Sequence, residues 1–300
     1  MNKLLVSLFT FFYVFVSCKN IENEVGPITI KAIPEKAVLF DFKEIFEELD
    51  YVYLSPSGNK GFIGEFNKIL YDGKSFFVFQ NGMGESSICK FDRYGKLIFQ
   101  EVSRTEGPGK FMGASDITLD NEKGLIEVLD SYQSKIVFLN KNDGTFINEM
   151  KLSPFNFKKF AKLENGRYAF YTANQPTELG SYNIYINQHN EHNLKHFIAI
   201  NPYLSGTIID ENCFSTNPLN SSHVYVEIFS NVIWRVSSDT VTQAYRVEFG
   251  NRWFDEKVLQ GLPGSDTRGK MAILILLSVR FCLFLHNQPR IAVASSGFLG

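Results

Sequence analysis

Residues 71–96 read YDGKSFFVFQNGMGESSICKFDRYGK, and residues 121–145 read NEKGLIEVLDSYQSKIVFLNKNDGT. The two stretches share one order of elements: a turn with Gly, an apolar strand, a loop, a second apolar strand, and a polar turn closed by Gly. A weaker third copy covers residues 163–186 and a degenerate fourth covers 208–249. Repeats of about 45 residues that each carry several strands predict the blades of a β-propeller.

The alternative all-β architecture is a β-sandwich. Its strands recur more closely along the chain, without a longer period that groups several strands into one repeat. Because the repeated unit is difficult to obtain otherwise, the sequence favours the propeller over the sandwich.

The composition of the chain argues against two classes of protein: disordered chains and nucleic-acid-binding proteins. The 300 residues carry 30 Lys+Arg against 32 Asp+Glu, a net charge of −2, and 44% of the residues are hydrophobic. This hydrophobic content excludes a wholly disordered chain. The balanced charge argues against a nucleic-acid partner, since proteins that bind nucleic acids normally present a basic face.

The first residues have the pattern of an export signal. Lys3 gives a positive start, Leu4 to Val16 is apolar, and the small Ser17 precedes Cys18. The apolar run is too short for a comfortable membrane span and predicts a cleaved leader, residues 1–17. Phe15-Val16-Ser17-Cys18 resembles a loose bacterial lipobox, which implies that Cys18 is lipidated. An ordinary signal peptide with an incidental Cys, or an uncleaved anchor, is the alternative.

Several segments resemble one family. Residues 53–69, the stretch Phe91–Lys96, the turn Gly107-Pro108-Gly109 and residues 231–250 look like the bacterial six-bladed β-propeller lipoproteins related to NHL-repeat propellers. The resemblance covers roughly residues 38–270 and implies a six-bladed propeller in the cell envelope. The family pattern usually has an acidic residue after Gly-Pro-Gly, where this chain has Lys110. The family is largely without an assigned activity, so the resemblance implies little chemistry.

The Gly-Pro-Gly turn allows two interpretations. As a ligand-binding loop at one face of the propeller it would offer the candidate site residues Arg104, Glu106, Gly107, Pro108, Gly109 and Lys110. As a tight connection between blades it needs only the backbone freedom of Gly and the fixed φ of Pro. The second interpretation is favoured.

Other candidate sites are weak. His189, His192 and His196 have the spacing of zinc ligands but lie in a polar segment typical of a hairpin tip, so we expect no metal site. Asp116, Asp120 and Asp130 could lie near one another, as carboxylates for glycoside chemistry do, although Asp is ordinary at strand ends and turns. No nucleotide-binding or catalytic motif occurs, so we expect no cofactor.

The end of the chain departs from the repeat pattern. Residues 271–300 contain no Asp, Glu, Lys or Tyr, and Met271 to Leu277 is continuously apolar. The expected organisation is therefore a leader (1–17), a tether with a first strand (18–37), the blades (38–270) and an anomalous tail (271–300). We hypothesise that this tail is foreign or frame-shifted. Translation of the other two frames beyond codon 270 tests the idea, because one should restore a strand-and-turn pattern.

These patterns favour a lipid-anchored binding or scaffold module in the bacterial envelope. Its partners would be the membrane, through the lipid, and an envelope protein, peptide or glycan. A propeller hydrolase or lyase that acts on a glycan or peptide is the alternative, and perturbed ionisable groups at the mouth of the central channel would favour it.

The lipid anchor can be tested directly. Replacing Cys18 with Ser removes the acylated thiol, so the protein should move from the membrane fraction to the soluble fraction while the fold is unchanged. Fractionation and immunoblotting measure the shift. A Cys18→Ser protein that stays membrane-bound after its leader is removed would show that the anchor is not a lipid.

Overall fold

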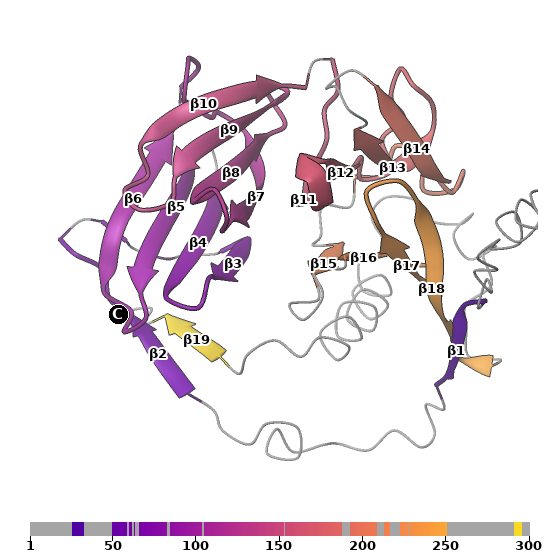
Figure 1. Cartoon of the computed structure of the whole chain (residues 1–300), viewed down its shortest axis with the longest axis horizontal. Coiled ribbons are helices and arrows are strands. Elements are labelled where there is room, and N and C mark those ends of the chain that lie inside the picture. Colours follow the sequence, from indigo (N-terminus) through magenta and orange to yellow (C-terminus); the bar gives the residue numbers. More distant parts are fainter. Residues whose placement is uncertain are drawn as a thin grey trace, which may run out of the picture.

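The computed structural model describes residues 26–32, residues 291–295 and most of 50–250; within 50–250 it omits 59, 62, 64–65, 83–84, 104, 153, 188–192, 209–212, 217–222 and 228. In the described part, four antiparallel sheets follow one another around a common centre (Figure 1). Each sheet contains four strands consecutive in the chain, and the first strand of each lies nearest the centre. The all-β propeller fold is thus confirmed, and the described residues form four blades.

The strands of each blade run outward in chain order. Blade 1 has β3 (Lys68–Tyr71), β4 (Ser75–Gly82), β5 (Glu85–Asp92) and β6 (Leu97–Ser103). Blade 2 has β7 (Ala114–Asp120), β8 (Leu125–Asp130), β9 (Lys135–Asn140) and β10 (Phe146–Lys151). Blade 3 has β11 (Lys159–Lys162), β12 (Tyr168–Tyr171), β13 (Tyr182–Asn187) and β14 (Leu194–Ala199), with a 3₁₀ turn, η2 (Glu164–Gly166). Blade 4 has β15 (Phe214–Thr216), β16 (His223–Val226), β17 (Val232–Val236) and β18 (Val241–Glu248).

Three more strands come from the two ends of the chain. β1 (Ile28–Lys31) pairs in parallel with β18 and becomes a fifth strand at the outer edge of blade 4. β2 (Asp50–Leu54) pairs in parallel with β19 (Ile291–Ser295), which lies within the anomalous tail. β2 and β19 form a separate two-stranded sheet beside blade 1 (Figure 1).

The two ends of the propeller differ in loop length. One end, which we call the short-turn end, holds the tight connections 72–74, 93–96, 121–124 and 237–240. The other end, the long-loop end, holds the connections 104–113, 152–158, 172–181 and 200–213. Three of these four lead from one blade to the next. Binding residues of rigid β-scaffolds usually lie on such loops, so we expect a functional site at the long-loop end.

The hydrophobic core lies between blades. Phe77 and Phe79 of β4 point to one side and pack with Ile117 and Val128 of blade 2. Phe76 and Val78, on the opposite face of the same strand, pack with Leu54 of β2. Alternate side chains of a strand point to opposite faces, so a sheet that is buried on both faces has continuous apolar strands. This explains the unbroken run at residues 76–79.

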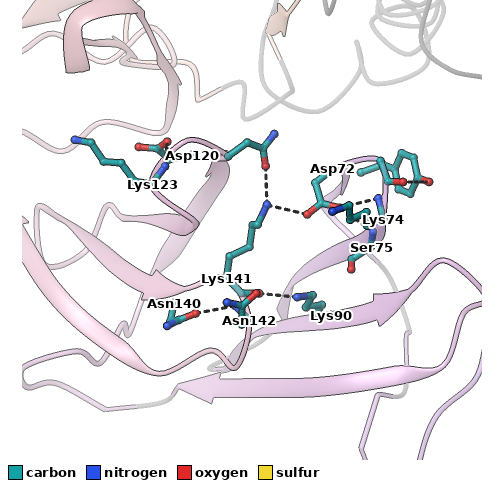
Figure 2. A network of polar contacts seen from close by, with 12 residues as sticks. Asp72, Lys74, Ser75, Lys90, Asp120, Lys123, Asn140, Lys141 and Asn142 are labelled. Carbon is teal, nitrogen blue, oxygen red and sulfur yellow. Dashed lines mark hydrogen bonds and ion pairs between the residues drawn. The ribbon is translucent and has the colours of Figure 1, made fainter.

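An ion pair joins blades 1 and 2 at the short-turn end (Figure 2). The Nζ of Lys141 lies 2.9 Å from Oδ2 of Asp72 in the β3–β4 turn, and it also donates to Asn121 at 2.9 Å. The Nζ of Lys90 donates to the carbonyl of Lys141 at 2.8 Å. Burial by itself would raise the pKa of Asp72, but Lys141 and the backbone N–H groups of Lys74 and Ser75 lower it below its ordinary value.

Blades 3 and 4 repeat this contact with the charges exchanged. Arg167, before β12, donates to Asp239 in the β17–β18 turn and to the carbonyl of Ser238 at 2.9 Å. In both pairs of blades, the first turn of one blade therefore binds the last turn of the next. Asp239 also begins an Asp-Thr-Val tripeptide that resembles a glycosylation acceptor, and the structure places its Asp and Thr in an ordinary hairpin turn.

The repeats found in the sequence correspond to the blades. The copies at 71–96 and 121–145 contain the middle strands of blades 1 and 2, and the copies at 163–186 and 208–249 fall in blades 3 and 4. The β-sandwich alternative is wrong, because the sheets succeed one another around a centre and do not form two facing layers. The described residues form four complete blades, so they do not show a six-bladed ring.

Removing one partner should cost different amounts of stability in the two ion pairs. Lys141→Met leaves the Asp72 carboxylate, whose side chain is only 6% exposed, without its cation, so we expect a loss of about 2 kcal/mol in the free energy of unfolding. Asp239→Asn removes a carboxylate that is 72% exposed, and Arg167 keeps the carbonyl of Ser238 as an acceptor, so the variant should lose little stability. Urea unfolding of both variants measures the difference. Equal losses in the free energy of unfolding would contradict the expected difference between the two ion pairs.

Candidate functional site: the inner strands at the long-loop end

Lys68 and Asp116 form an ion pair between the inner strands of blades 1 and 2. The Nζ of Lys68, the first residue of β3, lies 2.7 Å from Oδ1 of Asp116 on β7. The carboxylate is 2% exposed and the lysine side chain 19%. Oδ2 of Asp116 accepts a hydrogen bond from the backbone N–H of Phe160 at 3.1 Å. Asp116 thus joins the inner strands of three blades.

Lys159 adds a second cation beside this pair. It is the first residue of β11, it is buried, and its Nζ donates to the carbonyl of Ser115 at 3.0 Å. Lys68 and Lys159 therefore lie on the two sides of β7, where Lys68 pairs with Asp116 and Lys159 binds the carbonyl of the preceding residue, Ser115. These residues occupy the starts of β3 and β11 and the first half of β7, which places them toward the long-loop end. We call Lys68, Asp116 and Lys159 the inner-strand cluster.

A second charged group lies at the other end of the same strands. Nζ of Lys162, the last residue of β11, contacts Asp120 at the end of β7 and lies 2.5 Å from Oε1 of Glu127 on β8. Burial by itself would lower the pKa of Lys162, but the two carboxylates raise it above its ordinary value. This triad joins blades 2 and 3.

The pKa values of the two carboxyls of the triad are shifted in opposite directions. Burial raises the pKa of Glu127 above its ordinary value against the opposing effect of Lys162, because the side chain is fully buried. Burial opposes ionisation of Asp120 as well, but Lys162 and the N–H of Lys123 lower its pKa. Two carboxyls with pKa values shifted apart are typical of an acid–base pair. Glu127, however, has no exposed surface through which to reach a substrate.

A half-buried glutamate, Glu227, lies between blades 3 and 4 at the long-loop end. Oε1 of Glu227 accepts a hydrogen bond from Nδ2 of Asn183 at 2.7 Å. Burial raises the pKa of Glu227 to about 7, although the hydrogen bond from Asn183 opposes the shift. Nδ2 of Asn183 also donates to Oδ1 of Asn174 at 2.8 Å, and the N–H of Asn174 donates to Oδ1 of Asn183 at 3.0 Å.

Asn174 and its neighbour Ala173 have strained backbones. Their φ angles are +59° and +54°, in the left-handed region that residues other than Gly seldom adopt. The contacts to Asn183 hold them there. Asn174 also accepts a hydrogen bond at its carbonyl from the N–H of Gly206, 2.9 Å away, which connects loop 172–181 to loop 200–213.

The Gly-Pro-Gly turn lies against outer strands. Nζ of Lys135 donates to the carbonyl of Gly107 at 3.1 Å and to Glu149 at 2.9 Å, and the N–H of Gly109 donates to the same Glu149 carboxylate at 3.3 Å. Gly109 has a φ of +71°, and a Cβ there would lie 2.5 Å from the ring of Phe146. The turn is therefore a fixed connection between blades.

The other candidates from this turn are spread along the same rim. Glu106 and Pro108 are exposed, and Lys110 forms a partly exposed ion pair with Glu101 of β6, 3.5 Å away. Arg104 lies outside the described residues, as do Cys18, His189 and His192. The structure does not bring the Gly-Pro-Gly turn to the inner-strand cluster.

The third histidine considered as a zinc ligand, His196, and the two described cysteines lie in packed surroundings. His196 stacks on Tyr182 with ring centroids 3.9 Å apart. Cys89 and Cys213 are free and buried, and burial raises the pKa of Cys89 to about 11 and that of Cys213 well above its ordinary value. Within the described ranges, no three His, Cys, Asp or Glu side chains group as metal ligands. No helix in that part of the chain is long and apolar enough to cross a membrane.

The three aspartates considered for glycoside chemistry have separate structural roles. Asp116 binds Lys68, and Asp120 binds Lys162. Asp130 is buried at the end of β8, where its carboxylate accepts hydrogen bonds from the N–H groups of Met112, Tyr132 and Gln133. Each carboxylate is thus engaged in holding loops or blades.

Sequence reasoning missed Lys68, Lys159 and Glu227. Lys68 and Lys159 each open a short inner strand, KILY and KFAK, and the one available signal was a lysine directly before an apolar segment. Their surroundings come from residues 44 to 48 positions away in the chain. A single sequence does not show such pairings.

The sequence of the chain matches one protein family. The profile of the family "Domain of unknown function (DUF4934)" matches residues 27–286. The chain belongs to this family. No curated protein matches it.

A solved structure similar to this DUF4934 protein supports the fold. A Bacteroides fragilis protein described as exported superimposes with a TM-score of 0.61 at 18% identity, over 82% of this chain and 65% of that protein. The DUF4934 chain thus spans 65% of the length of this neighbour. A Bacteroides vulgatus member of the DUF4221 family gives a TM-score of 0.45 at 10% identity, over 67% of this chain and 62% of that one. The second likeness is too weak to support an argument.

Glu227 should make stability depend on pH. Its pKa is about 7 in the fold against 4.5 as its ordinary value. The unfolded chain therefore loses this proton first, so stability falls as the pH rises from about 4.5 to 7, by about 3 kcal/mol in total. Glu227→Gln keeps the acceptor for Asn183 and does not ionise. The variant should resemble the wild type near pH 4.5 and be more stable at pH 8.

Thermal melting of both proteins between pH 4.5 and 8 measures this difference. The difference between the two curves isolates Glu227, because every other titrating group is common to both. A constant difference across that pH range would show that Glu227 is ionised in the folded protein.

Proposed function

We propose that this DUF4934 protein is a lipid-anchored propeller of the bacterial cell envelope that binds a ligand at the long-loop end. The observation that supports this function best is the inner-strand cluster, in which Lys68 pairs with Asp116 and Lys159 binds the carbonyl of the neighbouring Ser115. The cluster offers two ammonium groups near the centre of the propeller. A partly desolvated positive site favours a negatively charged group.

The ligand class follows from this charge. A carboxylate-bearing peptide or glycan of the envelope would accept hydrogen bonds from the lysines, and charge-assisted hydrogen bonds are stronger than neutral ones. Propellers commonly bind ligands close to their central axis or on blade-connecting loops. The long loops would supply the remaining contacts and the specificity.

The envelope location is supported by the leader pattern at residues 1–17 with Cys18 at its junction. It is also in keeping with the Bacteroides fragilis neighbour, which is described as exported. A six-bladed, NHL-like ring is part of the same proposal. The separate β2–β19 sheet beside blade 1 supports it, because it shows strands beyond the four blades.

A propeller hydrolase or lyase is the second candidate. The observation in its favour is the triad of Lys162, Asp120 and Glu127, whose carboxyl pKa values are shifted in opposite directions. The burial of Glu127 favours a structural role over catalysis. Among the described residues, the free thiols have raised pKa values, so they are poor nucleophiles. Binding is therefore the better supported function.

An array of envelope peptides and glycans, paired by the presence or absence of a carboxylate, tests the ligand class. We expect preferential retention of the acidic members. Lys159→Met should weaken their binding at least tenfold, which corresponds to about 1.4 kcal/mol. Lys123→Met makes the same charge change on an exposed turn at the short-turn end and is the matched control.

Melting curves of the two variants would establish that both remain folded. Equal weakening by both would indicate non-specific electrostatic attraction and contradict the site. Retention without any preference for carboxylates would contradict the ligand class.

A further inference from the structure

Glu227 differs from the other acids inside the propeller. The buried acids of the described chain each have a lysine or several backbone N–H groups as partners: Asp116, Asp120, Glu127 and Asp130. Burial desolvates Glu227 as well, but within the described residues its carboxyl accepts one hydrogen bond, from the neutral amide of Asn183, and contacts no cation. A desolvated carboxylate is costly without a cation, so Glu227 is a place where a ligand can supply one.

Asn183 determines which oxygen of Glu227 is available. Oδ1 of Asn183 accepts hydrogen bonds from the hydroxyl of Thr172 at 3.1 Å and from the N–H of Asn174 at 3.0 Å. Its Nδ2 is therefore the donor to Oε1 of Glu227, 2.7 Å away. Because Oε1 is an acceptor, the proton of the neutral carboxyl lies on Oε2. Oε2 has no hydrogen-bond partner in the described part of the chain, so a cation can take the place of this proton.

The polar network reaches solvent at Glu227. Thr172, Asn174 and Asn183 are buried, whereas Glu227 is half-buried. The titratable groups next to it are Tyr225 on β16 and, against Tyr225, Tyr171 of β12 and Cys213 before β15. Burial raises the pKa of Tyr225 and of Cys213 well above their ordinary values, so both stay neutral at pH 8. Glu227, with a pKa of about 7, changes charge near neutral pH.

Glu227 and the inner-strand cluster lie at the same end of the propeller. The charge of Lys159 acts on Cys213, and that of Glu227 acts on Tyr225, which adjoins Cys213. β13, which carries Asn183, is two strands outward from β11, which begins with Lys159. Two strand spacings place these backbones about 10 Å apart, a distance that roughly three residues of extended peptide cover.

We propose that Glu227 binds an ammonium or guanidinium group of the ligand, and that the ligand is a peptide with an acidic and a basic group rather than an acidic glycan. This subsite rests on the proposed function and deepens it, because Lys68 and Lys159 would hold the carboxylate while Glu227 receives the cation. Peptides carry such cations on their Lys and Arg side chains. The ionised Glu227 also lowers the stability of the free protein, and groups with this cost are typical of functional sites.

Matched peptides test the cation subsite. Hexapeptides of Gly and Ser with blocked termini carry one Glu and one Lys, separated by one to three residues, and a twin of each carries N-acetyl-lysine. Calorimetric titration gives both dissociation constants. At pH 8 the best Lys peptide should bind roughly tenfold more tightly than its twin. At pH 5.5, where Glu227 is protonated and the peptide's own Glu remains ionised, this advantage should fall below about threefold.

Variants of the protein identify the group responsible. Glu227→Gln keeps the acceptor for Asn183 and should remove the advantage at pH 8 without changing the binding of the acetylated twins. Its melting curve shows that it is folded. Glu122→Gln removes an exposed acid at the short-turn end and is the matched control. An advantage that survives Glu227→Gln, or that does not change with pH, overturns the cation subsite.

Lys159→Met separates this failure from failure of the proposed function. It should weaken the binding of both twins equally. If it does so while the Lys peptides have no advantage, the carboxylate site stands and the cation subsite is wrong. An advantage that depends on Glu227 but not on Lys159 supports the subsite and contradicts the carboxylate site. Binding of acidic glycans and of no peptide overturns the subsite alone, and binding of neither overturns both.

Discussion

Packing between neighbouring four-stranded sheets is the interaction on which this structure depends. No blade has a core of its own: the two faces of β4 belong to different hydrophobic clusters, one shared with blade 2 and one with β2. Blades 2, 3 and 4 share two further clusters in the same manner. An isolated four-stranded sheet would expose both apolar faces to water. Each blade is therefore stable only between neighbours, and the order of blades in space follows their order in the chain.

Apolar packing alone would leave the blades free to slide, and the charged contacts limit this movement. Lys141 binds Asp72 between blades 1 and 2, Lys162 binds two carboxylates between blades 2 and 3, and Arg167 binds Asp239 between blades 3 and 4. Removing charges from water costs much of what their attraction returns, so such pairs add little net stability. Their geometry is satisfied in one alignment only. We therefore regard them as contacts that fix the register between blades.

The sequence predicted the middle strands of the blades and little of the inner ones. β4 and β8 are buried on both faces, which produces continuous apolar runs that stand out from the surrounding turns. The inner strands are short and carry charge, as in KFAK of β11, so their pattern is weak. The predicted turn at Gly107-Pro108-Gly109 is a tight connection, but its partners Lys135 and Glu149 lie far along the chain. The inner-strand cluster depends wholly on such long-range contacts.

The two ends of the propeller are held by different means, and this difference bears on function. At the short-turn end, side chains such as Asp72 and Asp92 accept hydrogen bonds from the N–H groups of their own turns, so each turn is fixed locally. At the long-loop end, the strained Ala173 and Asn174 are held by Asn183, which in turn is bound by Glu227 of the next blade. Strain of this kind persists only where the surroundings enforce it, and it gathers at functional sites. Loop 172–181 and Gly206 of the next loop are thus held by a polar network that crosses two blades, as the proposed binding surface would require.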